Sequence, residues 1–304
     1  MIGEITPFDD LYQLRRNVVR YSINGVKSQK GISVMSEDWD NLIILDACRN
    51  DLFEKEIDLN RFDEYERKIS KGSLTPEWAE KNFGSGVYPD TVYVSANPWI
   101  SQKAGGSFHR LEEIWKENFD EKLNTVPPNI VAEKAVNEFQ SDKRMIVHFM
   151  QPHPPFIGRG DEPLLETDGL HWSPDHIEGK EDREVFNVWH GTGRGILDKD
   201  EVWEAYRQSL SYVSDIALRL VEDIPGKSVI TSDHGILFGD RQMFPPIKGY
   251  GHPRGVRHPK LVTVPWGVLE DGRREIKAGD TTVSVEASDE VEERLKQFGY
   301  IDEV

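Results

Sequence analysis

The sequence predicts an α/β fold: a mostly parallel central sheet with helices on both faces, in three layers, formed by a single domain over residues 1–304. Two observations predict it. Short strand-like apolar segments alternate along the chain with amphipathic helical segments, as in a parallel sheet covered by helices. With 37% hydrophobic and 30% charged residues, the composition is that of a globular chain rather than a disordered one.

The predicted strands are short and rich in β-branched residues. They cover residues 41–46 (NLIILD), 91–96 (TVYVSA), 144–150 (RMIVHFM), 227–232 (KSVITS) and 260–266 (KLVTVPW). Helical spacing of apolar residues predicts helices over 108–119, 129–140 and 201–223. The last of these has the clearest apolar stripe, made by Trp203, Tyr206, Leu210, Val213, Ala217 and Leu220.

Three further segments lie at the ends of the chain or interrupt the alternation. Residues 8–27 predict an amphipathic helix with arginines beside its apolar face. Such a helix packs on its own domain or contacts a membrane surface. Residues 157–199 lack periodicity and are rich in Gly, Asp, His and Trp, so we expect an insertion that forms a lid over the active site. A C-terminal helix is expected over 288–300.

The chain is acidic, with a net charge of −17 from 37 basic and 54 acidic residues. This charge repels nucleic acids, so we expect no nucleic-acid partner. An anionic substrate would need a local positive centre, which a bound metal ion supplies. Cys48 is the only cysteine and is expected to be a packed core thiol. No Sec signal and no apolar run of membrane-spanning length is present, so we expect a cytoplasmic protein.

Chemically useful side chains follow the predicted strands at their carboxyl ends, where open α/β sheets bind ligands. Asp46 ends the first strand, His153 follows the third, and Asp233 and His234 follow the fourth. His252 lies shortly before the last strand. Each residue alone is more often a turn former, a helix cap or a structural histidine. Together they indicate a site for Zn, Mn or a related divalent ion, which mixed carboxylate and imidazole ligands suit.

Several segments occur in the order found in the alkaline phosphatase superfamily. They are LIILDACRNDLF, GSLTPEW, HFMQPHPPF, AYRQSLSYVSDIALRLVE leading into VITSDHG, and GHPRG followed by VPW. Over roughly residues 38–300 the sequence resembles the sulfatase-like branch of that superfamily, which includes archaeal proteins usually labelled sulfatases. The resemblance implies the fold predicted above and a metal-dependent hydrolase or transferase that acts on phosphate or sulfate esters.

The resemblance also implies a divalent metal ion, namely Mn, Zn, Mg or Ca. The implied metal ligands are Asp46, Thr75, Asp233, His234 and His252. One ion is expected rather than two, because two-metal members carry an Asp and a His on the helix before the Asp-His strand. Here Asp215 is followed four residues later by Arg219, so we interpret Asp215 as a solvated helix residue.

The implied nucleophile is Thr75, with Ser73 as the alternative, and His153 and His252 are the other implied catalytic residues. Thr75 followed by Pro76 also reads as a helix N-cap with proline at the first helical position. A helix N-terminus presents backbone N–H groups to an anion, so the two interpretations are compatible. Further candidates for substrate binding are Ser73, Arg49, Asn97, His171 and His190.

The ester class follows from the nucleophile segment. Formylglycine sulfatases carry Cys-x-Pro-x-Arg there, whereas SLTPEWA has neither the cysteine nor the arginine. The sequence therefore favours phosphate esters over sulfate esters, on a small molecule or on a glycan or lipid-linked precursor. Three alternatives stay open: a true sulfatase acting on a glycan, an inactive metal-stabilised binding relative, and a peripheral membrane protein anchored by residues 8–27.

Overall fold

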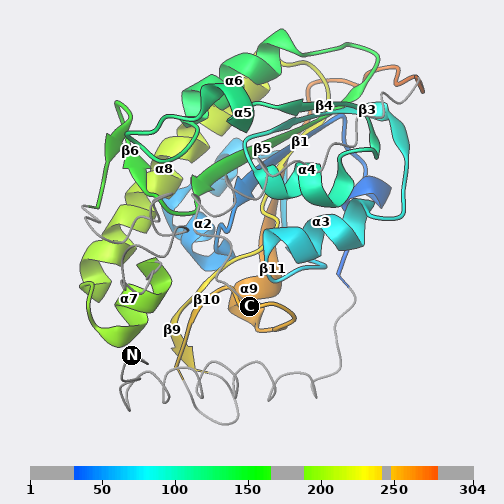
Figure 1. Ribbon diagram of the computed structural model, residues 1–304. Helices are drawn as coiled ribbons and strands as arrows, with labels where there is room; N and C mark the ends of the chain where they lie inside the picture. Colours follow the sequence, from blue (N-terminus) through cyan, green and yellow to red (C-terminus); the bar gives the residue numbers. More distant parts are fainter. Residues whose placement is uncertain (1–30, 166–187, 242–247, 280–304) are drawn as a thin grey trace, which may run out of the picture.

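The computed structural model describes residues 31–165, 188–241 and 248–279 (Figure 1). Within them lies a seven-stranded sheet of order β2-β11-β8-β1-β5-β3-β4. Its strands are β1 (Asn41–Asp46), β2 (Glu64–Ile69), β3 (Tyr88–Ser95), β4 (Phe108–Glu113), β5 (Arg144–Pro152), β8 (Ser228–Thr231) and β11 (Thr263–Leu269). Two antiparallel pairs lie outside it, formed by β6 (Ile157–Gly158) with β7 (Glu162–Pro163) and by β9 (Leu237–Arg241) with β10 (Lys248–Gly251).

The sheet is mostly parallel, as predicted. β8, β1, β5, β3 and β4 run parallel to one another in that order, whereas β11 pairs antiparallel with both β8 and β2. Every residue of β1 is buried because this central strand is covered on both faces. Its parallel neighbours β5 and β8 end beside it, so the carboxyl ends of these three strands meet at one edge of the sheet.

The helices form a layer on each face of the sheet. They are α2 (Asn50–Glu56), α3 (Thr75–Phe83), α4 (Pro98–Ala104), α5 (Trp115–Asn118), α6 (Pro128–Asn137), α7 (Val188–Arg194), α8 (Lys199–Asp223) and α9 (Pro259–Val262), with 3-10 turns at Val34–Ser36 and Leu59–Arg61. Ile43 and Leu45 of β1 belong to one apolar core with α2, α6 and α8, and Leu42 and Ile44 to another with α3 and α4. Because alternate residues enter opposite cores, the arrangement is a three-layer α/β/α fold (Figure 1).

The structure confirms most of the predicted elements. β1 has the predicted bounds, and β3, β5 and β8 lie within three residues of theirs. The predicted helices 129–140 and 201–223 correspond to α6 and α8. In α8 the apolar stripe faces the core, and the Asp198 side chain caps the helix by accepting from the Asp200 and Glu201 N–H groups. None of the described helices is long and apolar enough to cross a membrane.

The prediction of a helix over 108–119 is wrong for its first half. Residues Phe108–Glu113 form β4, the parallel edge strand beside β3, and only Trp115–Asn118 form α5. Phe108 and Leu111 are three residues apart, as on one helical face, whereas in a regular strand such residues point to opposite faces. Pairing with β3 decides between the two, and a local pattern does not contain that information.

The strand predicted over 260–266 begins later in the structure. Residues Pro259–Val262 form α9, with proline in its first turn and the His258 side chain accepting from the Lys260 N–H at 3.1 Å. The strand that follows, β11, covers Thr263–Leu269. β2, α2 and α4 have no counterpart among the predicted elements.

Some predictions fall on residues outside the described part of the chain. These are the terminal helices predicted over 8–27 and 288–300 and the middle of the predicted insertion 157–199. The described parts of that insertion form β6, β7 and α7 and lead into α8.

Candidate metal centre

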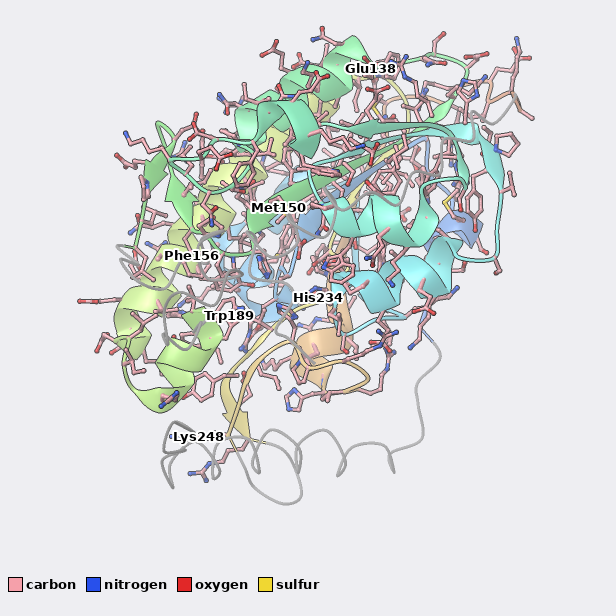
Figure 2. The ribbon with its side chains drawn as sticks, viewed as in Figure 1. Glu138, Met150, Phe156, Trp189, His234 and Lys248 are labelled. Carbon is pink, nitrogen blue, oxygen red and sulfur yellow. The ribbon has the colours of Figure 1, made fainter. Side chains whose placement is uncertain are left out.

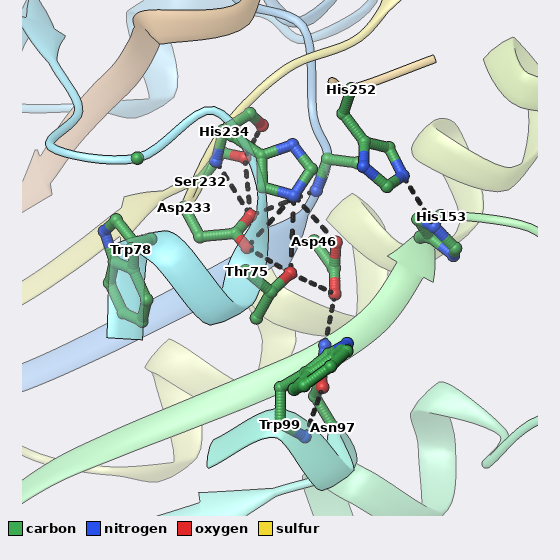
Figure 3. Close-up of polar contacts among 12 residues, drawn as sticks. Asp46, Thr75, Trp78, Asn97, Trp99, His153, Ser232, Asp233, His234 and His252 are labelled. Atoms are coloured by element: carbon green, nitrogen blue, oxygen red, sulfur yellow. Dashed lines mark hydrogen bonds and ion pairs between the residues drawn. The ribbon is translucent and has the colours of Figure 1, made fainter. Parts of the chain in front are cut away.

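The candidate centre lies where β1 and β8 end and α3 begins (Figure 3). Asp46 is the last residue of β1, Asp233 and His234 follow β8, and Thr75 is the first residue of α3. All four side chains are fully buried. His252, the fifth predicted ligand, is partly buried, and its ring centroid lies 5.0 Å from that of His234. The structure therefore brings together the five residues predicted as metal ligands.

The Thr75 hydroxyl lies at the middle of this cluster. Its Oγ1 donates to Asp233 Oδ2 at 2.8 Å and lies 3.4 Å from Asp46 Oδ2 and 3.3 Å from His234 Nε2. The interpretation of Thr75 as the N-cap is wrong, because Leu74 occupies that position with extended backbone. The Thr75 side chain is therefore not used in capping and is directed at the two carboxylates.

Backbone N–H groups hold Asp233 in place. Its Oδ1 accepts from the N–H of Ala47 at 3.1 Å and from that of His234 at 2.8 Å. Ala47 has φ 57°, a left-handed conformation that costs a residue with a β-carbon about 1 kcal/mol or more. Burial alone would raise the pKa of Asp233, but His234, His148 and the Thr75 hydroxyl together hold this pKa below its ordinary value.

The ring of His234 is oriented by the chain that follows it. Its Nδ1 lies 2.8 Å from the carbonyl oxygen of Gly235, which can only accept, so Nδ1 carries a proton. In the neutral ring, Nε2 then presents a lone pair 3.4 Å from Asp233 Oδ2 and 3.7 Å from Asp46 Oδ1. Either a second ring proton or a bound cation relieves the repulsion between these groups. This is the tautomer that metal-ligating histidines use.

His148, which lies inside β5, also belongs to the cluster. It is not among the site residues that the sequence predicts. Its Nε2 lies 3.8 Å from Asp46 Oδ2, and its Nδ1 lies 2.9 Å from Tyr93 Oη. Burial lowers the pKa of His148 to about 4, so the imidazole is neutral at pH 7. The signal in the sequence was a single titratable residue within the apolar run RMIVHFM.

The residues present fit a metal ion. Asp46, His148 and Asp233 each offer one ligand atom, and these atoms lie within 4.8 Å of one another. Two fully buried carboxylates that approach the same hydroxyl are costly as anions unless a positive charge compensates them. Mixed oxygen and imidazole donors suit Zn or Mn, whereas Mg and Ca prefer oxygen donors.

His153 and His252 form a pair beside the cluster (Figure 3). Their Nε2 atoms lie 3.3 Å apart, and His153 Nδ1 donates to the carbonyl oxygen of Pro154 at 2.7 Å. Burial lowers the pKa of His153 to about 3, so its ring is neutral and its Nε2 carries a lone pair. His252 Nε2 must then donate the proton that the two nitrogens share.

Ser73, the alternative nucleophile, takes part in a different network. Its Oγ lies 2.9 Å from Glu77 Oε2 and 2.9 Å from the Pro253 carbonyl oxygen. The same carboxylate oxygen accepts from the N–H groups of Ser73 and Gly255, at 2.9 and 3.3 Å. Ser73 thus ties α3 to the segment that carries His252.

Asn97 connects Asp46 to α4. Its Nδ2 donates to Asp46 Oδ2 at 2.6 Å, and its Oδ1 accepts from the Trp99 N–H at 3.0 Å and so caps the helix. The structure places this predicted substrate-binding residue in direct contact with the candidate metal centre.

The other candidates for substrate binding are placed less directly. The Arg49 guanidinium forms ion pairs with Asp51 at 2.9 Å and Asp240 at 2.8 Å, so its charge is already matched. His171 lies outside the described residues. His190 lies in α7, but its side chain is not among those described.

Three further single residues can be placed in the structure. Trp189 is buried, with its ring centroid 5.8 Å from that of Phe156, and anchors α7 to the core (Figure 2). Cys48 is a fully buried core thiol, as predicted. Asp215 is partly exposed on α8, where it forms an ion pair with Arg159.

Comparisons with known proteins found similarity among solved structures alone; no family model and no curated protein matches the chain. One similar structure is that of the phosphoethanolamine transferase EptA from Neisseria meningitidis, which is 12% identical to this chain. The match covers 86% of this chain and 55% of EptA, with a TM-score of 0.46. The chain thus spans about half the length of EptA. Another is the Streptococcus pyogenes phosphoglycerol transferase GacH, with 13% identity, coverages of 88% and 76%, and a TM-score of 0.40. A third is a Vibrio parahaemolyticus protein of the alkaline phosphatase superfamily, with 13% identity, coverages of 91% and 72%, and a TM-score of 0.36. That superfamily is the one that the sequence motifs resemble.

Proposed function

We propose that this chain is a metal-dependent enzyme that cleaves or transfers a phosphate ester, with Thr75 as its nucleophile. One observation carries the proposal. The Thr75 hydroxyl donates to Asp233 at 2.8 Å and lies 3.3 Å from His234, inside a fully buried cluster that fits a metal ion. A threonine hydroxyl is a weak nucleophile at neutral pH, and surroundings of this kind activate it.

In the proposed first step, Thr75 Oγ1 attacks the phosphorus atom. The Oγ1–P bond forms as the bond from phosphorus to the leaving oxygen breaks. The hydroxyl proton passes to Asp233 Oδ2, which already accepts its hydrogen bond. The leaving alkoxide takes a proton from water. In the second step the oxygen of water or of an acceptor hydroxyl bonds to phosphorus as the Oγ1–P bond breaks, which gives hydrolysis or transfer. Thr75 Oγ1 takes its proton back from Asp233 Oδ2. The proton of the attacking hydroxyl passes to solvent, where it neutralises the hydroxide left by the first step.

The residues around Thr75 have complementary tasks in this proposal. Asp46, Asp233 and His234 would hold the metal ion. When bound, the ion supplies positive charge that favours the deprotonated hydroxyl and offsets the charge of the phosphate oxygens. The first turn of α3 presents backbone N–H groups to the phosphoryl group. His252 is partly exposed and lies beside His234, which suits it to contact a phosphate oxygen.

Phosphate is favoured over sulfate because Thr75 stands where a formylglycine sulfatase carries cysteine, and the sole cysteine, Cys48, lies in the core. We extend the proposal to esters on a small molecule or on a glycan or lipid-linked precursor.

The test compares aryl phosphate monoester, phosphate diester and sulfate ester substrates. Metal-free protein is supplied separately with Mn, Zn, Mg and Ca. We expect metal-dependent turnover of one phosphate class, and a loss in Thr75→Ala of at least about 1000-fold. Ser73→Ala is the matched control: its turnover survives, because Ser73 Oγ bonds to Glu77 and Pro253 rather than to the metal cluster.

Three outcomes count against the proposal. Unchanged turnover in Thr75→Ala would eliminate Thr75 as the nucleophile. Turnover without added metal, in protein shown to be metal-free, would show that the reaction does not require a metal ion. Turnover of the sulfate ester alone would establish the sulfatase alternative. Circular dichroism serves as the check that the Thr75→Ala variant is folded.

A further inference from the structure

His148 presents a buried ring nitrogen to the carboxylate cluster. The residue is 0% exposed, and in the part of the chain that the structure describes its Nε2 makes no hydrogen bond. This atom lies 3.8 Å from Asp46 Oδ2, which is too long for a hydrogen bond and short enough for two ligands of one ion. A buried polar atom with no hydrogen-bond partner carries a free-energy cost, so its position needs an explanation.

The ring of His148 is held from two sides. Its Nδ1 lies 2.9 Å from the hydroxyl of Tyr93, a fully buried residue of β3. The ring of Trp78, from α3, packs edge-on against it, with centroids 5.8 Å apart and planes at 79°. These contacts fix the ring with Nε2 on the side of the carboxylates. Metal-ligating histidines commonly have such a partner on their second nitrogen.

We propose that His148 is a direct metal ligand through Nε2, and that Tyr93 Oη accepts a hydrogen bond from the Nδ1–H group and thereby sets the tautomer. The inference rests on the proposed function and adds a ligand from β5 to those that the motifs indicate. In the opposite arrangement Tyr93 donates to Nδ1, so that Nε2 carries a proton and His148 is a hydrogen-bond donor to the site. The two arrangements predict different metal coordination.

The added imidazole bears on metal selectivity. With His148 the site has two imidazoles, His148 and His234, and two carboxylates, Asp46 and Asp233. Nitrogen ligands favour Zn over Mg and Ca, which prefer oxygen. His148 therefore makes this a zinc-type centre, and its loss should weaken Zn binding far more than Mg binding.

The experiment uses Zn²⁺ and Mg²⁺ alone as probes on the metal-free full chain at pH 7. In His148→Gln we expect Zn affinity to fall by more than about 100-fold, and X-ray absorption of the Zn-loaded protein to fit one imidazole fewer. In Tyr93→Phe we expect a fall of about 10- to 100-fold with the imidazole count unchanged. His109→Gln, on the edge strand β4, is the control and keeps wild-type affinity and coordination.

The outcomes separate this inference from the proposed function. If His148→Gln keeps the wild-type Zn affinity and imidazole count, the inference fails, while ester turnover that depends on Thr75 leaves the function standing. A wild-type chain that binds neither Zn nor Mg overturns both. Circular dichroism checks that the metal-free variants are folded. If His148→Gln is unfolded, Tyr93→Phe decides, and a wild-type affinity in that variant overturns the inference.

Discussion

At the scale of single residues, Gly235 illustrates how a neighbour can dictate a residue type. A β-carbon at this position would lie 2.2 Å from the carbonyl oxygen of Lys260 in α9. The Gly235 N–H donates to the Leu261 carbonyl at 2.7 Å, and the Gly235 carbonyl orients the His234 ring. The glycine after the Asp-His pair is therefore required by the close approach of α9, and through it α9 supports the candidate metal centre.

Gly235→Ala should therefore destabilise the fold strongly. We expect a loss of about 3 kcal/mol or more, because the added methyl meets backbone that cannot rotate away. Gly255→Ala is the matched control: Gly255 has φ 77° but nothing within 4 Å of the added carbon, so only about 1 kcal/mol of backbone strain applies. Urea unfolding of both variants measures the difference, and equal losses would contradict the steric argument.

Residues at strand ends were predictable from the sequence because a polar side chain there interrupts an apolar run. Asp46 and Asp233 are of this kind. His148 was not predictable, since it lies within a strand and only the packing of β3 and α3 shows where its ring points. The choice between Ser73 and Thr75 was also open in the sequence. In the folded chain Ser73 contacts Glu77 and Pro253, whereas Thr75 faces the carboxylates, and only these contacts distinguish the two residues.

At the scale of elements, the segment that follows β11 fastens the amino ends of the central strands. Arg274 donates to the carbonyl oxygens of Gln140 and Lys143 at 2.9 and 2.5 Å, and to the carbonyl oxygen of Asp40 at 2.8 Å. It also donates to Asn41 Oδ1 at 2.7 Å. These acceptors lie just before β5 and at the start of β1, so a single side chain joins the beginnings of both strands.

Arg274→Met should loosen this attachment. The variant keeps the aliphatic stem but leaves partly buried carbonyl oxygens without their donor, so we expect a loss of about 2–4 kcal/mol of unfolding free energy. Lys277→Met is the control, since Lys277 is exposed and its contact with Glu275 is long, at 3.8 Å. Chemical denaturation of both variants gives the comparison, and a loss below about 0.5 kcal/mol in Arg274→Met would refute this role.

Elements were predictable where burial alone determines them. β1 is an apolar run bounded by Asn41 and Asp46, and α8 is clearly amphipathic. β4 and β2 depend on strand pairing instead. The apolar spacing of the first predicts a helix, and the second, EYERKI, is so polar that only its pairing with β11 identifies it as a strand. Edge strands have less burial to constrain their sequence, and for this reason local patterns miss them.

At the scale of the whole molecule, the charge balance opposes the proposed substrate. A chain of net charge −17 repels an anionic ester at long range, and salt screens this repulsion over about 10 Å. Two of the acidic residues behind this charge, Asp46 and Asp233, are buried side by side in the candidate centre. A divalent cation in the centre would attract the anionic ester once the ester is close. It would also offset the cost of burying two like charges.

Asp46→Asn should therefore separate stability from metal binding. The amide oxygen can still accept from Asn97, and one of two neighbouring buried charges is removed, so we expect the metal-free variant to be at least as stable as the wild type. In the wild type, Zn²⁺ at 100 times its dissociation constant should add about 2.7 kcal/mol, which corresponds to a rise in Tm of about 5 °C. The variant should lose that rise.

Thermal unfolding with and without Zn²⁺ measures both effects, and Asp215→Asn, a partly exposed carboxylate on α8, is the control that keeps the full rise. A variant that keeps the rise would remove Asp46 from the ligand set, and one that is much less stable without metal would show that the two carboxylates do not repel.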